Sequence, residues 1–294
     1  MREPDRWKSE TLDAIFEALA TSPETSQSLI FKGARVLARR LPSVRRQSLD
    51  IDTNLAESFC ARHPPLEEQR QVLEKQVQRA LRRYFESRHP VSHSVDSLTL
   101  KSKPPRGHPL GWNAFELRVQ VRDLRHPEVR AGSFPSLVVD IAAPERLIDG
   151  SVEPLAIGEH DVRAYSLHRI AGEKLRAFLT SLPAYRTKLR RPGDVVRAKD
   201  LHDEALILRA YPLPFEAAFW RQAGEEFRVT CASRYVDCGG IETFREDWDA
   251  TRRTYTGGSI VGAEVSFAEA EQALDTIVRF FAAEGLIPFV FPLP

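Results

Sequence analysis

The feature that most constrains this chain is a short alternating segment with two aspartates, Arg46-Gln47-Ser48-Leu49-Asp50-Ile51-Asp52. The alternation predicts a strand over residues 47–55, in which successive side chains point to opposite faces. Asp50 and Asp52 then share one face, with Cα atoms about 6.5–7 Å apart, and the intervening aliphatic residues anchor the strand. Two carboxylates this close repel each other unless a cation binds them, so the segment favours a divalent-metal site. The alternative is a charged face on an edge strand, because Asp-x-Asp alone is a weak motif.

A third carboxylate, Asp140, interrupts an otherwise aliphatic, strand-like run over residues 137–141. An aspartate in such surroundings is costly to bury unless it is paired or binds a metal; the alternative is a solvated strand end. Three carboxylates on neighbouring strands are what two-metal phosphoryl transfer requires. We therefore predict that Asp50, Asp52 and Asp140 bind two Mg²⁺ ions, with Mn²⁺ as an alternative.

The spacing of apolar residues predicts the remaining elements. Helices are expected over residues 7–20, 23–41, 66–88, 167–182, 199–210, 215–222, 241–253 and 267–285, and further strands over 95–100, 115–121 and 136–142. A proline- and glycine-containing loop is expected between residues 144 and 167. We predict an α+β fold, with a mixed sheet and flanking helices over residues 1–150 and a mostly helical domain over 151–294.

Composition and charge add few constraints. The 42 Lys+Arg and 41 Asp+Glu give a net charge of +1, which neither supports nor excludes a nucleic-acid partner. No apolar run reaches the ~18 residues of a membrane span, and the charged N-terminus is unlike a signal peptide. We expect a cytoplasmic protein with no membrane partner.

Cys60, Cys231 and Cys238 lack C-x-x-C spacing and are expected to be reduced thiols rather than zinc ligands.

Two groups of basic residues flank the predicted site. They are Arg35, Arg39, Arg40, Arg45 and Arg46, and then Arg186, Lys188, Arg190, Arg191, Arg197 and Lys199. Arginine suits bidentate contacts with phosphate, so a nucleoside triphosphate or an RNA backbone could bind either group. The alternative is an ordinary solvated surface.

The segment Phe31-Lys32-Gly33-Ala34-Arg35 resembles the glycine-led helix start before Asp-x-Asp in polymerase-β-like nucleotidyltransferases. A glycine there lets a triphosphate approach the N–H groups of the helix start. That superfamily has Gly-Gly or Gly-Ser, so Ala34 removes one hydroxyl contact while staying small.

The pattern R-x-S-x-D-I-D over residues 46–52 is similar to the signature of the AbiEii/AbiGii toxin family. Further blocks agree in order: Glu173-Lys174-Leu175-Arg176-Ala177, then Arg197-Ala198-Lys199-Asp200-Leu201-His202-Asp203, then a closing helix from residue 265. The resemblance extends from about residue 29 to residue 281.

This resemblance implies a Mg²⁺-dependent nucleotidyltransferase that moves NMP from an NTP onto an acceptor hydroxyl. It suggests an RNA acceptor, with the tRNA 3′ end as one candidate, and a toxin of a toxin–antitoxin or phage-defence system with a cognate antitoxin. It implies catalytic roles for Asp50, Asp52, Asp140, Lys174 and Asp200, and nucleotide binding by Lys32, Gly33, Ala34, Arg46, Ser48, Lys174 and Lys199.

Other interpretations stay open. The Ala34 departure fits a catalytically idle module that only binds nucleotide or a partner, and transfer onto a protein hydroxyl would use the same metal site. Lys174 could be a solvated lysine, and Asp200 and Asp203 could be ordinary acids of a first helical turn. His168 and His202 are expected on helix surfaces or behind the site rather than as bases. The sequence does not identify the NTP or the acceptor.

Overall fold

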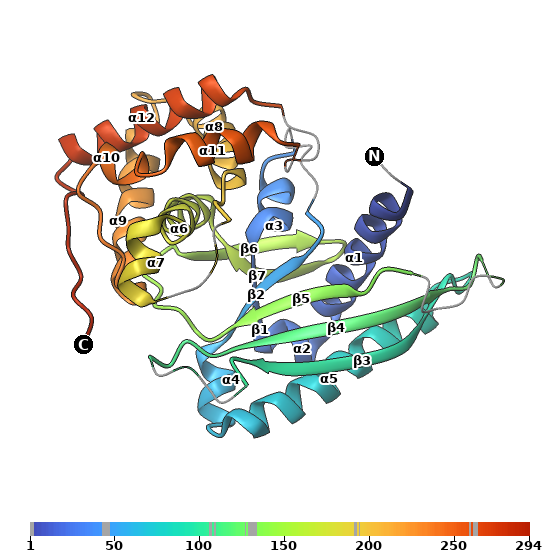
Figure 1. Ribbon diagram of the computed structural model, residues 1–294. Helices are drawn as coiled ribbons and strands as arrows, with labels where there is room; N and C mark the ends of the chain where they lie inside the picture. Colours follow the sequence, from blue (N-terminus) through green and yellow to red (C-terminus); the bar gives the residue numbers. More distant parts are fainter. Residues whose placement is uncertain are drawn as a thin grey trace. The chain divides into compact units, whose positions relative to one another are not determined.

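The computed structural model describes residues 3–42, 48–105, 108, 110–126, 128, 134–190, 193, 195–258, 260 and 264–294. Over these residues, seven strands form one mixed sheet in the order β3-β4-β5-β2-β1-β7-β6. The strands are β1 (Leu29–Lys32), β2 (Ile51–Leu55), β3 (His93–Lys103), β4 (Ala114–Asp123), β5 (Leu137–Ala142), β6 (Val152–Ile157) and β7 (His160–Tyr165), as Figure 1 shows. The predicted α+β class is confirmed.

Strand β2 lies at the centre of this sheet. It pairs antiparallel with β1 and parallel with β5, and β5 pairs antiparallel with β4. The register places Asp52 opposite Lys32 on one side and opposite Asp140 on the other. Because residues directly opposite on neighbouring strands share a face, this register brings the two aspartates together.

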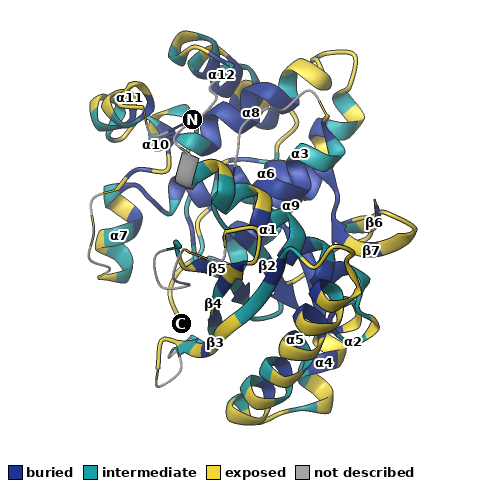
Figure 2. Cartoon of the chain, turned by 90° about the vertical axis from the view of Figure 1, so that its right-hand side faces the viewer, coloured by how far each residue is buried: buried dark blue, intermediate teal, exposed yellow. Residues whose placement is uncertain are grey.

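Helices α1 (Glu3–Thr21), α2 (Pro23–Ser28) and α5 (Leu66–Ser87) lie along one face of the sheet (Figure 1). The apolar stripe of α5 is buried, including Leu73, Val77 and Leu81, and its other side is exposed (Figure 2). This is the pattern of an amphipathic helix covering a core. The short helix α4 (Glu57–Arg62) follows β2.

The chain divides into two compact units. The first comprises Met1–Val36, Gln47–Glu145 and Glu153–Ala164, and holds the body of the sheet; the second comprises Leu37–Arg46, Arg146–Val152 and Tyr165–Pro294. The domain division at residues 150 and 151 stays a prediction.

The second unit is mostly helical. Its helices are α6 (Leu167–Leu179), α7 (Pro183–Leu189), α8 (Lys199–Ala210), α9 (Ala217–Arg234), α10 (Ile241–Phe244), α11 (Trp248–Thr256) and α12 (Phe267–Ala283). Helices α6 and α9 approach closely because Gly172 has no side chain: a Cβ there would lie 2.8 Å from the carbonyl carbon of Glu226. Glu226 and Arg169, both fully buried, pair between these helices at 2.7 Å.

Three sequence predictions of local structure were wrong. Residues 23–41 form α2, β1 and α3 (Gly33–Arg40) rather than one helix, because a strand buried on both faces has a continuous apolar run that periodicity cannot distinguish from a helix. The strand predicted over residues 47–55 begins at Ile51; residues 48–50 are not in a strand, and residue 47 lies outside the described residues. The expected loop after residue 144 contains β6 and β7, joined at Gly158, which has a positive φ of 60°.

Several helix boundaries also differ from those predicted; α9, expected over residues 215–222, extends to Arg234. The stretch 241–253 is split into α10 and α11, and α7 was not anticipated as a separate helix. Among the described residues, no helix combines the length and hydrophobicity that crossing a membrane would require.

Candidate active site

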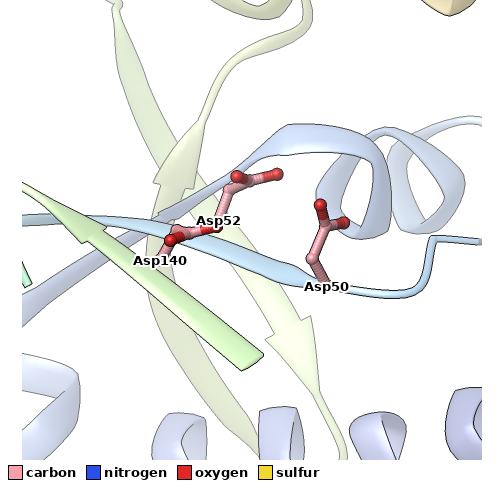
Figure 3. A group of neighbouring side chains, drawn as sticks. All are labelled: Asp50, Asp52 and Asp140. Atoms are coloured by element: carbon pink, nitrogen blue, oxygen red, sulfur yellow. The ribbon is translucent and has the colours of Figure 1, made fainter. Parts of the chain in front are cut away.

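Three carboxylates meet at the centre of the sheet. Asp50 directly precedes β2, Asp52 lies on β2 and Asp140 lies opposite it on β5, as Figure 3 shows. One oxygen of each side chain lies within 4.8 Å of the others, and each residue is partly exposed. Hard oxygen donors at this separation fit a divalent cation such as Mg²⁺ or Mn²⁺. The structure therefore brings the three predicted metal ligands together, although only two of them lie on strands.

Gly33, the first residue of α3, lies against Asp52. Its φ of +76° is in the left-handed region, and a Cβ at this position would lie 2.8 Å from both Cβ and Cγ of Asp52. Any larger residue would therefore displace the carboxylate and strain the backbone. Glycine at this position lets the start of α3 pack directly against the acidic site. Ala34, the next residue, is buried.

The segment that carries Asp50 is held by Arg35 of α3. The buried Arg35 guanidinium donates hydrogen bonds to the carbonyl oxygens of Asp50 (3.0 Å) and Ser48 (2.6 Å) and pairs with Asp13 at 2.6 Å. The hydroxyl of Ser48 donates a short hydrogen bond to the Asp50 carboxylate. These contacts hold residues 48–50 in a bend, so that Asp50 does not continue the strand. Arg35 was predicted to belong to a phosphate-binding group, but its described contacts are to the chain itself.

Charged neighbours surround Asp140. Lys103 Nζ lies 3.9 Å from its carboxylate and forms a closer ion pair with Glu116, which lies opposite Asp140 on β4. Burial raises the pKa of Asp140; Lys103 opposes this effect, while Asp50 and Glu116 add to it. Hydrogen bonds from Lys103 and Arg118 lower the pKa of Glu116, so Glu116 is ionised at neutral pH. Lys103 and Glu116 were not predicted from the sequence, because their position beside Asp140 depends on strand register.

On the other side of the acidic pair lies Lys32. Its side chain is buried, with Nζ 3.8 Å from a carboxylate oxygen of Glu145. Its position opposite Asp52 places a cation beside the acidic site, and its role in nucleotide binding stays a prediction.

In the second unit, Lys174 of α6 is 8% exposed and bridges two aspartates of α8. Its Nζ makes a short ion pair with Asp203 and lies 3.4 Å from Asp200, which also accepts a 2.6 Å hydrogen bond from Arg197. Lys174 is therefore not an ordinary solvated lysine. Asp203, left out of the predicted site, pairs with Lys174 more closely than Asp200 does. In the sequence, this position is indicated by the three-residue spacing between Asp203 and Asp200, which places both side chains on one face of a helix.

Glu204, the next residue along α8, is also buried, at 1% exposed. Neither of its carboxylate oxygens has a hydrogen-bond partner among the described residues. Burial raises its pKa well above the ordinary value; Lys174 opposes this, and the negative charges of Asp200 and Asp203 add to it. Glu204 is thus a neutral acid in this cluster.

The remaining predicted residues have varied positions. Lys199 is the partly exposed first residue of α8, and Arg46 lies outside the described residues, as do Arg45 and Arg191. His168 and His202 are both buried rather than at a helix surface. His202 lies 3.5 Å from Asp203 and accepts a hydrogen bond from the Glu264 backbone, which packs it into the unit's interior.

Structural comparison shows which class of protein has this fold. A protein from H. pylori described as a nucleotidyltransferase has a TM-score of 0.51 and 13% identity, and the match covers 98% of this chain and 100% of that one. The nucleotidyltransferase toxin MenT4 of Mycobacterium tuberculosis also has a TM-score of 0.51, with 14% identity over 96% of this chain and 86% of that one. The fold is that of a nucleotidyltransferase.

The family follows from the sequence. Residues 15–280 match the profile of the family described as nucleotidyl transferase AbiEii toxin, type IV toxin–antitoxin system, and the chain belongs to that family. It is therefore a nucleotidyltransferase enzyme, which confirms the predicted resemblance and enzyme class. No curated protein matches the sequence.

Proposed function

We propose that this protein transfers NMP from an NTP onto a hydroxyl group of RNA, with a divalent ion bound by Asp50, Asp52 and Asp140. The observation that carries the proposal is the meeting of these three carboxylates within 4.8 Å beside Gly33, at the start of α3. A divalent ion there would supply Lewis-acid chemistry, neutralising phosphate charge and acidifying the attacking hydroxyl. Family membership supports a role as the toxin of a toxin–antitoxin pair.

In this reaction the acceptor oxygen bonds to the α-phosphorus, the bond from that phosphorus to the β-phosphate oxygen breaks, and pyrophosphate leaves. The hydroxyl proton passes to a base, a role we assign to Asp140 because it lies opposite Asp52 and would hold the ion that acidifies the hydroxyl. Gly33 and Ala34 would let the triphosphate approach the N–H groups at the start of α3. Lys32, Lys174 and Lys199 would neutralise phosphate charge, with Lys174 oriented by Asp200 and Asp203.

Ser48 and Arg46 complete the proposed nucleotide site. Ser48 acts by orienting Asp50, to which its hydroxyl donates a hydrogen bond. For the acceptor we propose RNA, including the tRNA 3′ end, and for regulation a cognate antitoxin. We propose Mg²⁺ as the physiological ion and a cytoplasmic location.

The test is to incubate the protein with Mg²⁺, each α-labelled NTP in turn, and total RNA. Label on RNA is expected from the wild type and not from Asp50→Ala/Asp52→Ala. The matched control is Asp149→Ala/Asp161→Ala, which also removes two carboxylates but from exposed positions. Equal labelling by the two double variants would contradict the site. Label on protein would identify a protein-modifying enzyme, and no label with measurable NTP binding would favour the idle binding module.

A further inference from the structure

Strand β4 has one apolar face and one polar face. Phe115, Leu117, Val119 and Val121 are buried, whereas the alternating positions carry the polar side chains Glu116, Arg118, Gln120 and Arg122. Because Glu116 lies opposite Asp140, the polar face of β4 is the face on which the acidic site opens.

Strand β3 continues this polar face. Lys101 lies opposite Glu116, and Lys103 lies opposite Ala114, so both lysines are on the same side of the sheet as Asp140. The resulting cation group consists of Lys101, Lys103, Arg118 and Arg122. The side chains of Lys103, Arg118 and Arg122 are 51%, 54% and 52% exposed, so their charges are accessible to a ligand.

Two acids orient this cation group without neutralising it. Glu116 pairs with both Lys103 and Arg118, and Asp96 pairs with Arg122 at 3.1 Å. Four cations thus face three acids, because Asp140 also lies 3.9 Å from Lys103, and the buried, ionised Glu116 pairs with two of the cations. A cationic side chain that is already restrained by an ion pair loses less conformational entropy on binding a phosphate than a mobile side chain does.

Three described members of the basic groups identified from the sequence make contacts within the chain. Arg40 donates to the Tyr165 carbonyl at 2.6 Å, and Arg186 donates to the Gly193 carbonyl at 2.6 Å. Lys188 pairs with Asp237 at 2.6 Å. These three side chains stabilise the fold, whereas the β3–β4 cation group presents exposed positive charge on the sheet face of the acidic site.

We propose that the β3–β4 cation group binds the phosphodiester backbone of a single-stranded RNA end and leads its terminal hydroxyl to Asp140. The proposal deepens the proposed function and rests on it for the identity of the reacting group. Arg118 and Arg122 lie four residues apart on one face of β4, about 13–14 Å, so they line up along the strand as contacts for an extended polynucleotide. Lys103, 3.9 Å from Asp140, is the cation nearest the reacting hydroxyl. Sequence-independent phosphate contacts of this kind characterise single-strand binding surfaces.

The test is equilibrium binding of a fluorescent single-stranded oligoribonucleotide, by anisotropy, in EDTA and without NTP. Arg118→Gln/Arg122→Gln is compared with the wild type and with Arg83→Gln/Arg79→Gln, which removes two exposed arginines from α5. The β4 double variant should bind at least about tenfold more weakly. Its slope of log affinity against log salt should be shallower by about 1.4, the value for two lost contacts to a single strand. The α5 variant should match the wild type.

Equal binding and equal salt slopes for the two double variants would overturn the proposal, as would failure of the wild type to bind the oligoribonucleotide. Melting temperatures of all proteins establish that the variants are folded. Because this assay contains no NTP, its outcome is separate from the labelling test. RNA binding lost in the β4 variant, with no label transferred by the wild type, would support the cation group and contradict the proposed reaction. In an active enzyme, the β4 variant should raise KM for RNA and leave KM for NTP unchanged.

Discussion

The carboxylate of Asp52 occupies the space into which a side chain on Gly33 would project. A Cβ at residue 33 would come within 2.8 Å of Asp52 Cγ, and the backbone there has a φ of +76°. The start of α3 can therefore pack against Asp52 of β2 because residue 33 has no side chain.

Gly33→Ala should abolish most activity. The methyl group must push the Asp52 carboxylate aside, and a displacement of about 1 Å in a reacting site costs on the order of 100-fold in rate. Gly158→Ala is the matched control, because Gly158 also has a positive φ (60°) but a Cβ there meets nothing within 4 Å. Both variants should lose about 1–2 kcal/mol of stability from backbone strain, but only Gly33→Ala should lose turnover. Comparable turnover in the two proteins would show that the Gly33–Asp52 contact is not needed.

Arg35→Lys should lower turnover and raise the Mg²⁺ concentration needed for half-maximal activity. Lysine cannot reproduce the fork of hydrogen bonds that Arg35 makes to the carbonyls of Ser48 and Asp50, so Asp50 becomes less well placed. A loss of about 10- to 100-fold in turnover is expected. Asp13→Asn is the control, since it removes the ionic partner of Arg35 and leaves both carbonyl bonds. A Mg²⁺ dependence identical to that of the wild type would contradict the positioning role.

Lys174→Met should destabilise the protein as well as inactivate it. The change leaves Asp203 buried without its cation, and breaking a buried pair in this way costs about 3–5 kcal/mol. Adding Asp203→Asn should recover part of that stability, as measured by urea unfolding, because the unpaired charge is removed. If Lys174 contacts the triphosphate, the double variant stays inactive although it is folded. Recovery of activity together with stability would assign Lys174 a structural role only.

Glu204→Gln should flatten the pH dependence of stability. Burial raises the pKa of Glu204 in the folded protein above its ordinary value near 4.5. At pH values between the ordinary and the raised pKa, the folded protein therefore keeps a proton on Glu204 that the unfolded chain has released. Its contribution to stability is therefore present at low pH and is lost as pH rises. Glutamine has the same shape without the titration, so the variant should gain stability relative to the wild type from pH 5 to pH 8 in urea unfolding. A constant difference over this range would contradict a neutral Glu204.

From the sequence we could predict those residues of the candidate site whose position is visible in a local pattern. Asp140 stands out because burying a lone carboxylate among aliphatic residues is costly, and that cost can be read within one strand. Asp50 and Asp52 stand out for a similar reason, although Asp50 lies before β2 rather than on it. Helix α5 was predicted almost to its ends because its apolar stripe is long and regular.

Residues whose role depends on distant segments could not be predicted in this way. Glu116 and Lys103 become neighbours of Asp140 only through the registers of β3 with β4 and of β4 with β5. Arg35 looks like any surface arginine until the bend at residues 48–50 places two carbonyl oxygens around it. Strand β1 was missed because it is buried on both faces, which removes the alternation by which strands are recognised.

The parallel pairing of β2 with β5 also determines when the site can exist during synthesis. Parallel neighbours need a long crossover, and here β3 and β4 are made between the two strands that carry Asp52 and Asp140. A nascent chain that has not yet released β5 from the ribosome lacks one of the three carboxylates, whatever else has folded. The three-carboxylate centre therefore cannot assemble on the growing chain before β5 has emerged and paired with β2.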